Sequence, residues 1–177
     1  AEGLRLENRS GGELTPADWD AMWIFYQDTG ARKWGQPYLT RAAFDLMAAR
    51  MADQIIMSLA YDGERAVAGA LHFIGADTLY GRYWGARADI PYLHFELCYY
   101  QAIDIAIARG LKTIEAGAQG GHKLARGYAP VATWSAHYIA DAGFRRAVAE
   151  FLERERAAEE VEADFLAQHL PYRRGRD

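Results

Sequence analysis

The chain has 177 residues, of which 51% are hydrophobic and 25% charged, and this is the composition of a folded globular protein of about one domain. A formal net charge of -4 argues against a surface built to grip duplex nucleic acid such as DNA, because such a surface is strongly basic, but it leaves open a local basic patch that contacts RNA. Cys98 is the only cysteine, so the chain has no internal disulfide and suits a reducing compartment.

The sequence contains no apolar run of about 18 residues and no signal peptide at its start. We therefore expect a cytoplasmic protein without a transmembrane segment. The chain begins Ala-Glu-Gly without an initiator methionine, which is typical of a processed chain or of a fragment of a longer one. A targeting segment would then be missing from it.

Two helices are predicted first. Thr15 and Pro16 favour a helix start, and this helix is expected to run to about Thr29. After a polar and aromatic turn, Thr40 is expected to cap a second helix. Each helix has one apolar face, which consists of Trp19, Met22, Trp23 and Tyr26 in the first and of Phe44, Met47 and Met51 in the second.

Three strands are predicted next, in an antiparallel meander. Residues 55–61 and 66–74 are apolar, and the Asp-Gly pair between them is typical of a hairpin turn. A third strand is predicted over residues 78–84. Its side chains are expected to alternate, so that one face holds Tyr80, Arg82 and Trp84.

The second half of the chain is predicted to hold two helices and two strands. These are a helix over residues 92–109, a strand over 112–116 that can pair in parallel, a strand over 131–139 and a final helix over 141–170. No repeat or linker divides the chain. The predicted fold class is α/β (α+β), with residues 1–177 in a single domain whose mixed, mostly antiparallel sheet is flanked by helices.

A glycine-rich loop, EAGAQGGHKLARGY, runs from Glu115 to Tyr128. Its four glycines let backbone N–H groups approach a ligand, and Lys123 and Arg126 supply charges that hold a phosphate or a carboxylate. The alternative interpretation is a long turn with two solvated cations.

The order of the predicted elements resembles the GNAT acyltransferase fold. Three segments, YGRYWGA at residues 80–86, FELCYYQAID at 95–104 and the loop at 115–128, are similar to the Fem-related (FemAB-like) family of peptidoglycan biosynthesis or recognition. The segment RKWGQPYLT at residues 32–40 fits the same family. The resemblance extends from about Tyr26 to Leu152.

The resemblance implies acyl or aminoacyl transfer to an amine acceptor, such as a peptide or a cell-wall precursor. Fem-type enzymes carry two GNAT-like domains, so the chain is expected to be the C-terminal half of a longer protein, completed by an N-terminal partner domain or as a homodimer. Aminoacyl-tRNA or acyl-CoA is the expected donor, and no cofactor is expected to be bound permanently. Lys123 matches the lysine of the family's Phe-Lys-x-Gly-Phe-Gly segment, although here the glycine follows it by four positions rather than two.

Two alternatives to a Fem-type transferase stay open. One is a GNAT-like module that binds a peptide or glycan precursor without catalysis. The other is an acetyl-CoA-dependent N-acetyltransferase. Such enzymes bind the pyrophosphate with a glycine-rich turn at a helix start, and the segment GARADIP at residues 85–91 lacks that glycine pair, which argues against acetyl-CoA as the donor.

Acyl transfer to an amine needs a base and a hydrogen-bond donor for the developing oxyanion. Glu115 is the predicted base, because it ends an apolar strand beside the loop; a structural ion pair with Lys123 or Arg126 is the alternative. His122 is expected to shuttle a proton or to donate to a substrate carbonyl. Lys123 is expected to contact the donor.

Substrate contacts are predicted from the loop and from aromatic side chains, which combine apolar area with a polar tip. The candidates are Gln119, Gly120, Gly121, Arg126, Tyr128, Glu96, Tyr99 and Trp84. A favourable contact with a helix start is the alternative for Glu96, and a place in the core is the alternative for the aromatic residues. His72 is expected to be a hydrogen-bonded core histidine, and no residues have the spacing of a metal site.

Overall fold

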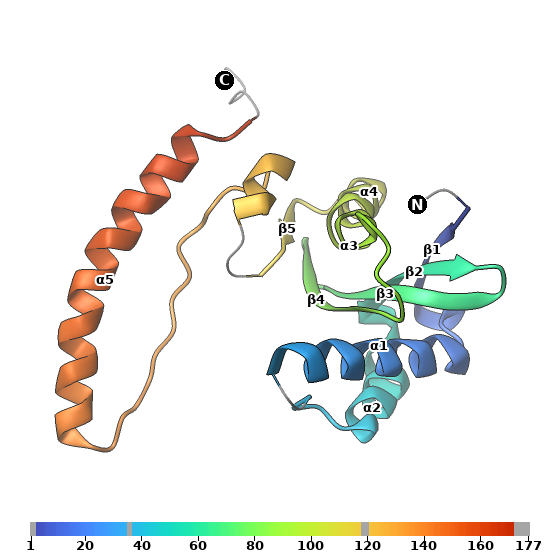
Figure 1. Ribbon diagram of the computed structural model, residues 1–177, viewed down its shortest axis with the longest axis horizontal. Helices are drawn as coiled ribbons and strands as arrows, with labels where there is room; N and C mark the ends of the chain where they lie inside the picture. Colours follow the sequence, from blue (N-terminus) through green and yellow to red (C-terminus); the bar gives the residue numbers. More distant parts are fainter. Residues whose placement is uncertain (1–2, 35–36, 118–120, 172–177) are drawn as a thin grey trace. The chain divides into compact units, whose positions relative to one another are not determined.

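The computed structural model describes residues 3–34, 37–117 and 121–171, and the chain divides into two compact units, residues 1–118 and 119–177 (Figure 1). Unit 1 holds a sheet and the helices that cover it. Unit 2 holds most of the glycine-rich loop and a long helix. The single domain and its place in a longer protein stay predictions.

Unit 1 is built on a five-stranded sheet whose strands lie in chain order. Neighbouring strands pair antiparallel except for the last two, which pair in parallel, and this confirms the predicted meander and the predicted parallel strand. The strands are β1 (Arg5–Ser10), β2 (Ile55–Asp62), β3 (Arg65–Ile74), β4 (Thr78–Ala86) and β5 (Thr113–Glu115).

Helices α1 (Pro16–Trp34) and α2 (Arg41–Met51) lie together on one face of the sheet (Figure 1). The Thr15 N–H donates to the Asp18 carboxylate at 2.8 Å, and the Asp18 N–H donates to Thr15 Oγ1 at 3.3 Å. This reciprocal cap fixes the predicted start of α1. The helix continues to Trp34, beyond the end predicted near Thr29. Two short 3-10 turns, η1 (Gly11–Glu13) and η2 (Ala52–Gln54), connect these helices to β1 and β2.

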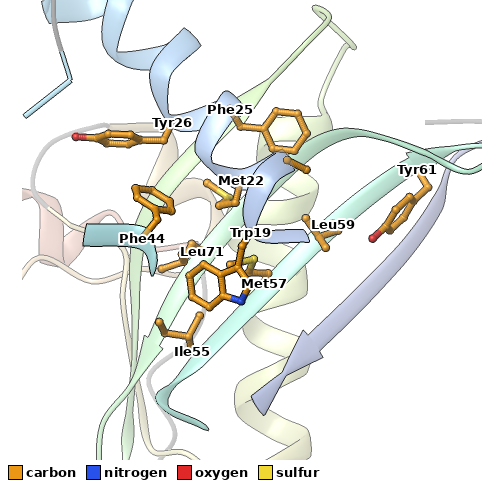
Figure 2. Close-up of a cluster of buried hydrophobic side chains, with 11 residues drawn as sticks. Trp19, Met22, Phe25, Tyr26, Phe44, Ile55, Met57, Leu59, Tyr61 and Leu71 are labelled. Carbon is orange, nitrogen blue, oxygen red and sulfur yellow. The ribbon is translucent and has the colours of Figure 1, made fainter. Parts of the chain in front are cut away.

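The main group of buried side chains lies between these two helices and the sheet (Figure 2). Trp19 and Met22 project from α1, and Phe44 projects from α2, as the helical spacing predicts, and Phe25 of α1 joins them. Alternate residues of β2 and one residue of β3 meet them: Ile55, Met57, Leu59, Tyr61 and Leu71. Burying each such side chain contributes about 1.5–3 kcal/mol to folding.

A continuous helical segment covers the opposite face of the sheet. It consists of α3 (Leu93–Phe95), the π-helical turn η3 (Glu96–Tyr100) and α4 (Gln101–Ala108). The predicted helix over residues 92–109 is thereby confirmed, but the sequence pattern did not indicate the π turn. Leu93 and Leu97 are fully buried against small residues of the sheet, namely Ala60, Ala68, Ala70 and Ala86.

Unit 2 contains the 3-10 turn η4 (Gly121–Arg126) and the helix α5 (Ala142–Gln168). Asp141 caps α5 by accepting a hydrogen bond from the Phe144 N–H at 2.7 Å, close to the predicted helix start. The predicted strand over residues 131–139 is wrong, since the described residues of unit 2 form no strand. A single extended segment is not stable as a strand without a neighbour to share its backbone hydrogen bonds.

Among the helices that the structure describes, none combines the length and the hydropathy that spanning a bilayer requires.

Candidate active site

A bulge interrupts β4 in the middle of the sheet. Leu71 of β3 lies opposite Tyr83, but the next residue, His72, lies opposite Gly81, so Arg82 is the extra residue. The expected alternation along β4 is therefore wrong: Tyr83 packs under α1 and α2, while Trp84 packs against the cluster under α3. The bulge reverses which side chains face each layer.

Trp84 and Tyr99, two of the predicted substrate contacts, lie on the same layer of unit 1. The ring of His94 joins them, with its centroid 5.2 Å from that of Trp84 and 5.6 Å from that of Tyr99. Tyr99 is 5% exposed, so its ring serves mainly as core.

Glu96, in the π turn, is the last residue of a series of hydrogen bonds that connects the helical segment to the sheet. Gln101 Nε2 donates to Glu96 Oε1 at 2.9 Å, Asn8 Nδ2 donates to Gln101 Oε1 at 2.7 Å, and Ser58 Oγ donates to Asn8 Oδ1 at 2.7 Å. These three hydrogen bonds connect β1 and β2 to the helical segment that covers them. Sequence reasoning missed it, because its members are far apart in sequence.

Glu115 is the last residue of β5, and its side chain is exposed. Its backbone carbonyl approaches Gly81 of β4: a Cβ on Gly81 would lie 3.4 Å from the Glu115 oxygen. The end of β5 is thus placed beside the bulge in β4.

The cationic part of the loop folds in unit 2 as the turn η4. Arg126 Nη1 donates to the carbonyl of His122 at 2.7 Å, and the Tyr128 N–H donates to the carbonyl of Lys123 at 3.3 Å. Partial burial lowers the pKa of Lys123, which makes its ammonium easier to deprotonate. The turn brings His122, Lys123 and Arg126 together, and Gly121, also a candidate, is its exposed first residue.

Two predicted contacts, Gln119 and Gly120, lie outside the described residues. Glu115 belongs to unit 1 and Lys123 to unit 2, so a shared site of this carboxylate and this ammonium stays a prediction.

His72 lies in β3 with 1% of its surface exposed, and both ring nitrogens are buried. Burial lowers its pKa to about 4, and a backbone hydrogen bond with Leu97 offsets this only in part. The imidazole is therefore neutral at pH 7. Its predicted burial is confirmed, and the Leu97 backbone is the partner for the predicted hydrogen bond.

A polar and aromatic cluster that sequence reasoning missed lies where β4 meets the chain between α1 and α2. Arg82 Nη2 donates to the Tyr38 hydroxyl at 2.7 Å, and the hydroxyls of Tyr38 and Tyr83 are 3.0 Å apart. Burial raises the pKa of Tyr83, and its bond with Tyr38 acts in the same direction. The aromatic residues in the predicted inter-helix turn were a signal for this cluster.

A shallow hollow of about 270 Å³ lies between β1, β2 and α4, and Asn8 is part of its lining. Its polar lining includes Ser10, Asp104 and Arg109, and Arg109 Nη2 donates to Ser10 Oγ at 2.7 Å. In the part of the chain that the structure describes, no group of His, Cys, Asp and Glu side chains has the arrangement of a metal site.

Comparison with known proteins gives a family and a fold. The model of the FemAB-like family, described as peptidoglycan biosynthesis/recognition, matches residues 1–174. No curated protein matches the chain.

Solved acetyltransferases share its fold at low sequence identity. A possible acetyltransferase from Clostridium difficile 630 is 9% identical with a TM-score of 0.52, over 76% of this chain and 98% of that one. AAC(6')-Iy, solved with the bisubstrate analogue CoA-S-monomethyl-acetylneamine, is 10% identical with a TM-score of 0.51, over 77% and 99%. The ribosomal-protein-S18-alanine N-acetyltransferase from Escherichia coli is 18% identical with a TM-score of 0.44, over 62% of this chain, which spans 64% of that protein's length.

The order of helices and strands in unit 1 and the likeness to solved acetyltransferases establish a GNAT-like α/β fold. The family model covers nearly the whole chain. The chain therefore belongs to the FemAB-like family and has the GNAT acyltransferase fold.

Proposed function

We propose that this protein transfers an acyl or aminoacyl group to an amine acceptor, and that the acceptor is a peptide or a cell-wall precursor. The observation that carries this proposal is the match of residues 1–174 to the FemAB-like family of peptidoglycan biosynthesis/recognition. The GNAT-like sheet supports it, because this fold is shared with acetyltransferases.

The reaction needs few groups from the protein. The acceptor nitrogen attacks the carbonyl carbon of the donor, the new C–N amide bond forms, and the ester or thioester bond breaks. We assign Glu115 as the base that takes the proton from the amine, and Lys123 as the donor to the developing oxyanion. The leaving group takes up a proton from solvent through His122, and Glu115 releases its proton to solvent. The lowered pKa of Lys123 supports its assignment, because a partly buried ammonium interacts more strongly with developing negative charge.

The donor is aminoacyl-tRNA or acyl-CoA, and the two differ in what must hold their phosphates. In this chain the turn between β4 and the helical segment that begins with α3 has no glycine pair. This feature supports aminoacyl-tRNA. We further propose that the protein acts in the cytoplasm and that an N-terminal partner domain or a second copy completes the acceptor site.

The experiment is a transfer assay with the 177-residue chain. Radiolabelled alanyl-tRNA and radiolabelled acetyl-CoA are each incubated with a muropeptide that carries a free amine, and the labelled amide is quantified. A product with either donor supports the proposal and names the donor. A chain that binds the muropeptide but forms no amide with either donor is a binding module instead.

A further inference from the structure

The cluster of Tyr38, Arg82 and Tyr83 has more hydrogen-bond donors than its members use among themselves. Arg82 Nη2 lies 2.7 Å and the Tyr83 hydroxyl 3.0 Å from the Tyr38 hydroxyl oxygen. Two hydroxyls have two hydrogens and the bond between them uses one, so one phenolic O–H stays available. Arg82 uses one of its five N–H donors at Tyr38.

The positive charge of Arg82 has no carboxylate partner in the described part of the chain. Its side chain is exposed, and the guanidinium carbon lies 5.0 Å from the centroid of the Tyr83 ring. Contact with an aromatic face holds a guanidinium in place while its N–H groups stay free to bind an anion.

Tyr38 is held in position by both of its neighbours in the chain. Pro37 packs so closely against α1 that a Cβ on Gly30 would lie 2.9 Å from Pro37 Cγ. The Leu39 N–H donates to the Tyr26 hydroxyl at 2.9 Å, and the rings of Tyr26 and Tyr38 meet edge to face. Tyr38 itself is 67% exposed, so a ligand reaches a donor whose position is already fixed.

A group of donors around one cation suits a carboxylate. The two carboxylate oxygens match the fork of a guanidinium, and either oxygen also accepts a bond from a phenol. A neutral amide has one acceptor oxygen and no charge, so it forms fewer and weaker bonds with the same groups. A phosphate is typically held by backbone N–H groups at a helix start or in a turn, which this cluster does not supply.

The cluster lies near the predicted base along the sheet. Tyr80 of β4 lies opposite Glu115 of β5, and Arg82 follows Tyr80 by two residues, or about 7 Å of strand. A Cβ on the intervening Gly81 would lie 3.4 Å from the Glu115 carbonyl oxygen. A molecule anchored at Arg82 therefore extends over a short distance to the end of β5.

We propose that Arg82 and Tyr38 bind a free carboxylate of the acceptor, so that the protein prefers an acceptor with a free carboxylate over its neutral amide. This inference rests on the proposed function and deepens it, because it names a chemical group that the acceptor carries besides its amine. The transferred group does not supply this carboxylate, since its carboxyl carbon is an ester in aminoacyl-tRNA and a thioester in acyl-CoA.

The test measures binding of the muropeptide without any donor, by isothermal titration calorimetry. The muropeptide with free carboxylates is compared with the same muropeptide after its carboxylates are converted to amides. Arg82→Gln removes the charge, and Tyr38→Phe removes the hydroxyl but keeps the ring. Arg65→Gln is the matched control, because Arg65 at the start of β3 is also exposed and its loss changes the net charge equally.

The wild type and Arg65→Gln are expected to bind the free-carboxylate form about tenfold tighter or more, the effect of a hydrogen bond between charged groups. In Arg82→Gln this ratio of Kd values falls towards one, and in Tyr38→Phe it falls by less, while all melting temperatures stay close to that of the wild type. Equal affinity of the wild type for both forms, no binding of either form, or an undiminished ratio in Arg82→Gln overturns the inference.

A failure of the proposed function is distinguishable from a failure of this site, because binding is measured without a donor. A chain that prefers the free-carboxylate form but produces no amide in the transfer assay has the carboxylate site and lacks the proposed activity. A chain that produces the amide but binds both forms equally has the activity and lacks this site.

Discussion

Asp18 shows how one side chain connects the start of α1 to the sheet. Its carboxylate is 3% exposed and accepts hydrogen bonds from Arg9 Nη1 at 2.9 Å to each oxygen, from Thr15 at 2.8 Å and from the Tyr61 hydroxyl at 2.8 Å. Burial alone would raise its pKa, but the bonds from Thr15, Tyr61 and Arg9 together lower it. The same carboxylate and burial raise the pKa of Tyr61 to about 12.

Asp18→Asn is expected to lower the free energy of unfolding by about 1–3 kcal/mol, because the amide cannot accept all the bonds that the buried carboxylate accepts, although Arg9 keeps its bond to Glu7. Urea denaturation measures the difference. Asp20→Asn is the matched control: the Asp20 side chain is 61% exposed and pairs with Arg41 at the surface, so its loss is expected to cost less than about 1 kcal/mol. Equal losses in the two variants would show that the Asp18 network does not stabilise the fold.

His72 predicts a specific dependence of stability on pH. Its pKa is about 4 in the folded chain, below the ordinary 6.5, so the unfolded chain binds a proton at a pH where the folded chain does not. Stability is therefore full above about pH 6.5 and declines as the pH falls towards 4.

Between pH 7.5 and pH 5 this one residue is expected to remove about 2 kcal/mol of stability. The decline should be smaller by that amount in His72→Gln, while the other histidines act equally in both proteins. Urea unfolding of both proteins at the two pH values gives the comparison. Equal losses of stability in the two proteins would mean that His72 takes up a proton as readily in the folded chain as in the unfolded chain.

At the scale of elements, the packing of α1 on β4 depends on Gly85. A Cβ at this position would lie 2.1 Å from the carbonyl oxygen of Phe25 in α1, which is far inside contact distance. Because the obstacle is backbone, a small side-chain movement does not relieve it, and the helix must shift.

Gly85→Ala is accordingly expected to lower the free energy of unfolding by about 3 kcal/mol, at the upper end for overpacking. The open position Gly12 again serves as the control, with a change within about 0.5 kcal/mol for Gly12→Ala. Thermal or urea unfolding of both variants and the wild type measures these differences in the free energy of unfolding. A Gly85→Ala protein as stable as the wild type would contradict the close approach of α1 to β4.

The elements that the sequence predicted are those with a strong internal period. The spacing of Trp19, Met22 and Tyr26 in α1 predicted a buried helix face, and the apolar runs predicted β2 and β3. The strand β1 was missed, because RLENRS carries little apolar signal and is held by its pairing with β2. Residues 131–139 alternate like a strand, but alternation alone supplies no partner for the backbone.

At the scale of the molecule, the fold class followed from element order, whereas the candidate site did not. Neighbouring loop residues such as His122 and Lys123 were predicted together and lie together in η4. The pairing of His72 with Gly81 depends on a one-residue bulge at Arg82, and no local pattern marks that bulge. A site whose residues come together only through the pairing register of distant strands cannot be predicted from the order of residues along the chain.

Acyl transfer through the loop that carries Lys123 is tested most directly by the kcat/KM of Lys123→Ala in the donor-dependent transfer assay. Lys112→Ala is the matched control, because the Lys112 side chain is 79% exposed and pairs only at 3.8 Å with Asp77. Lys123→Ala is expected to lower kcat/KM by about ten- to a thousandfold, the range for one donor to a transition-state oxyanion, and Lys112→Ala to leave it unchanged. An unchanged kcat/KM in Lys123→Ala would contradict the assignment and return Lys123 to an ordinary place on the protein surface.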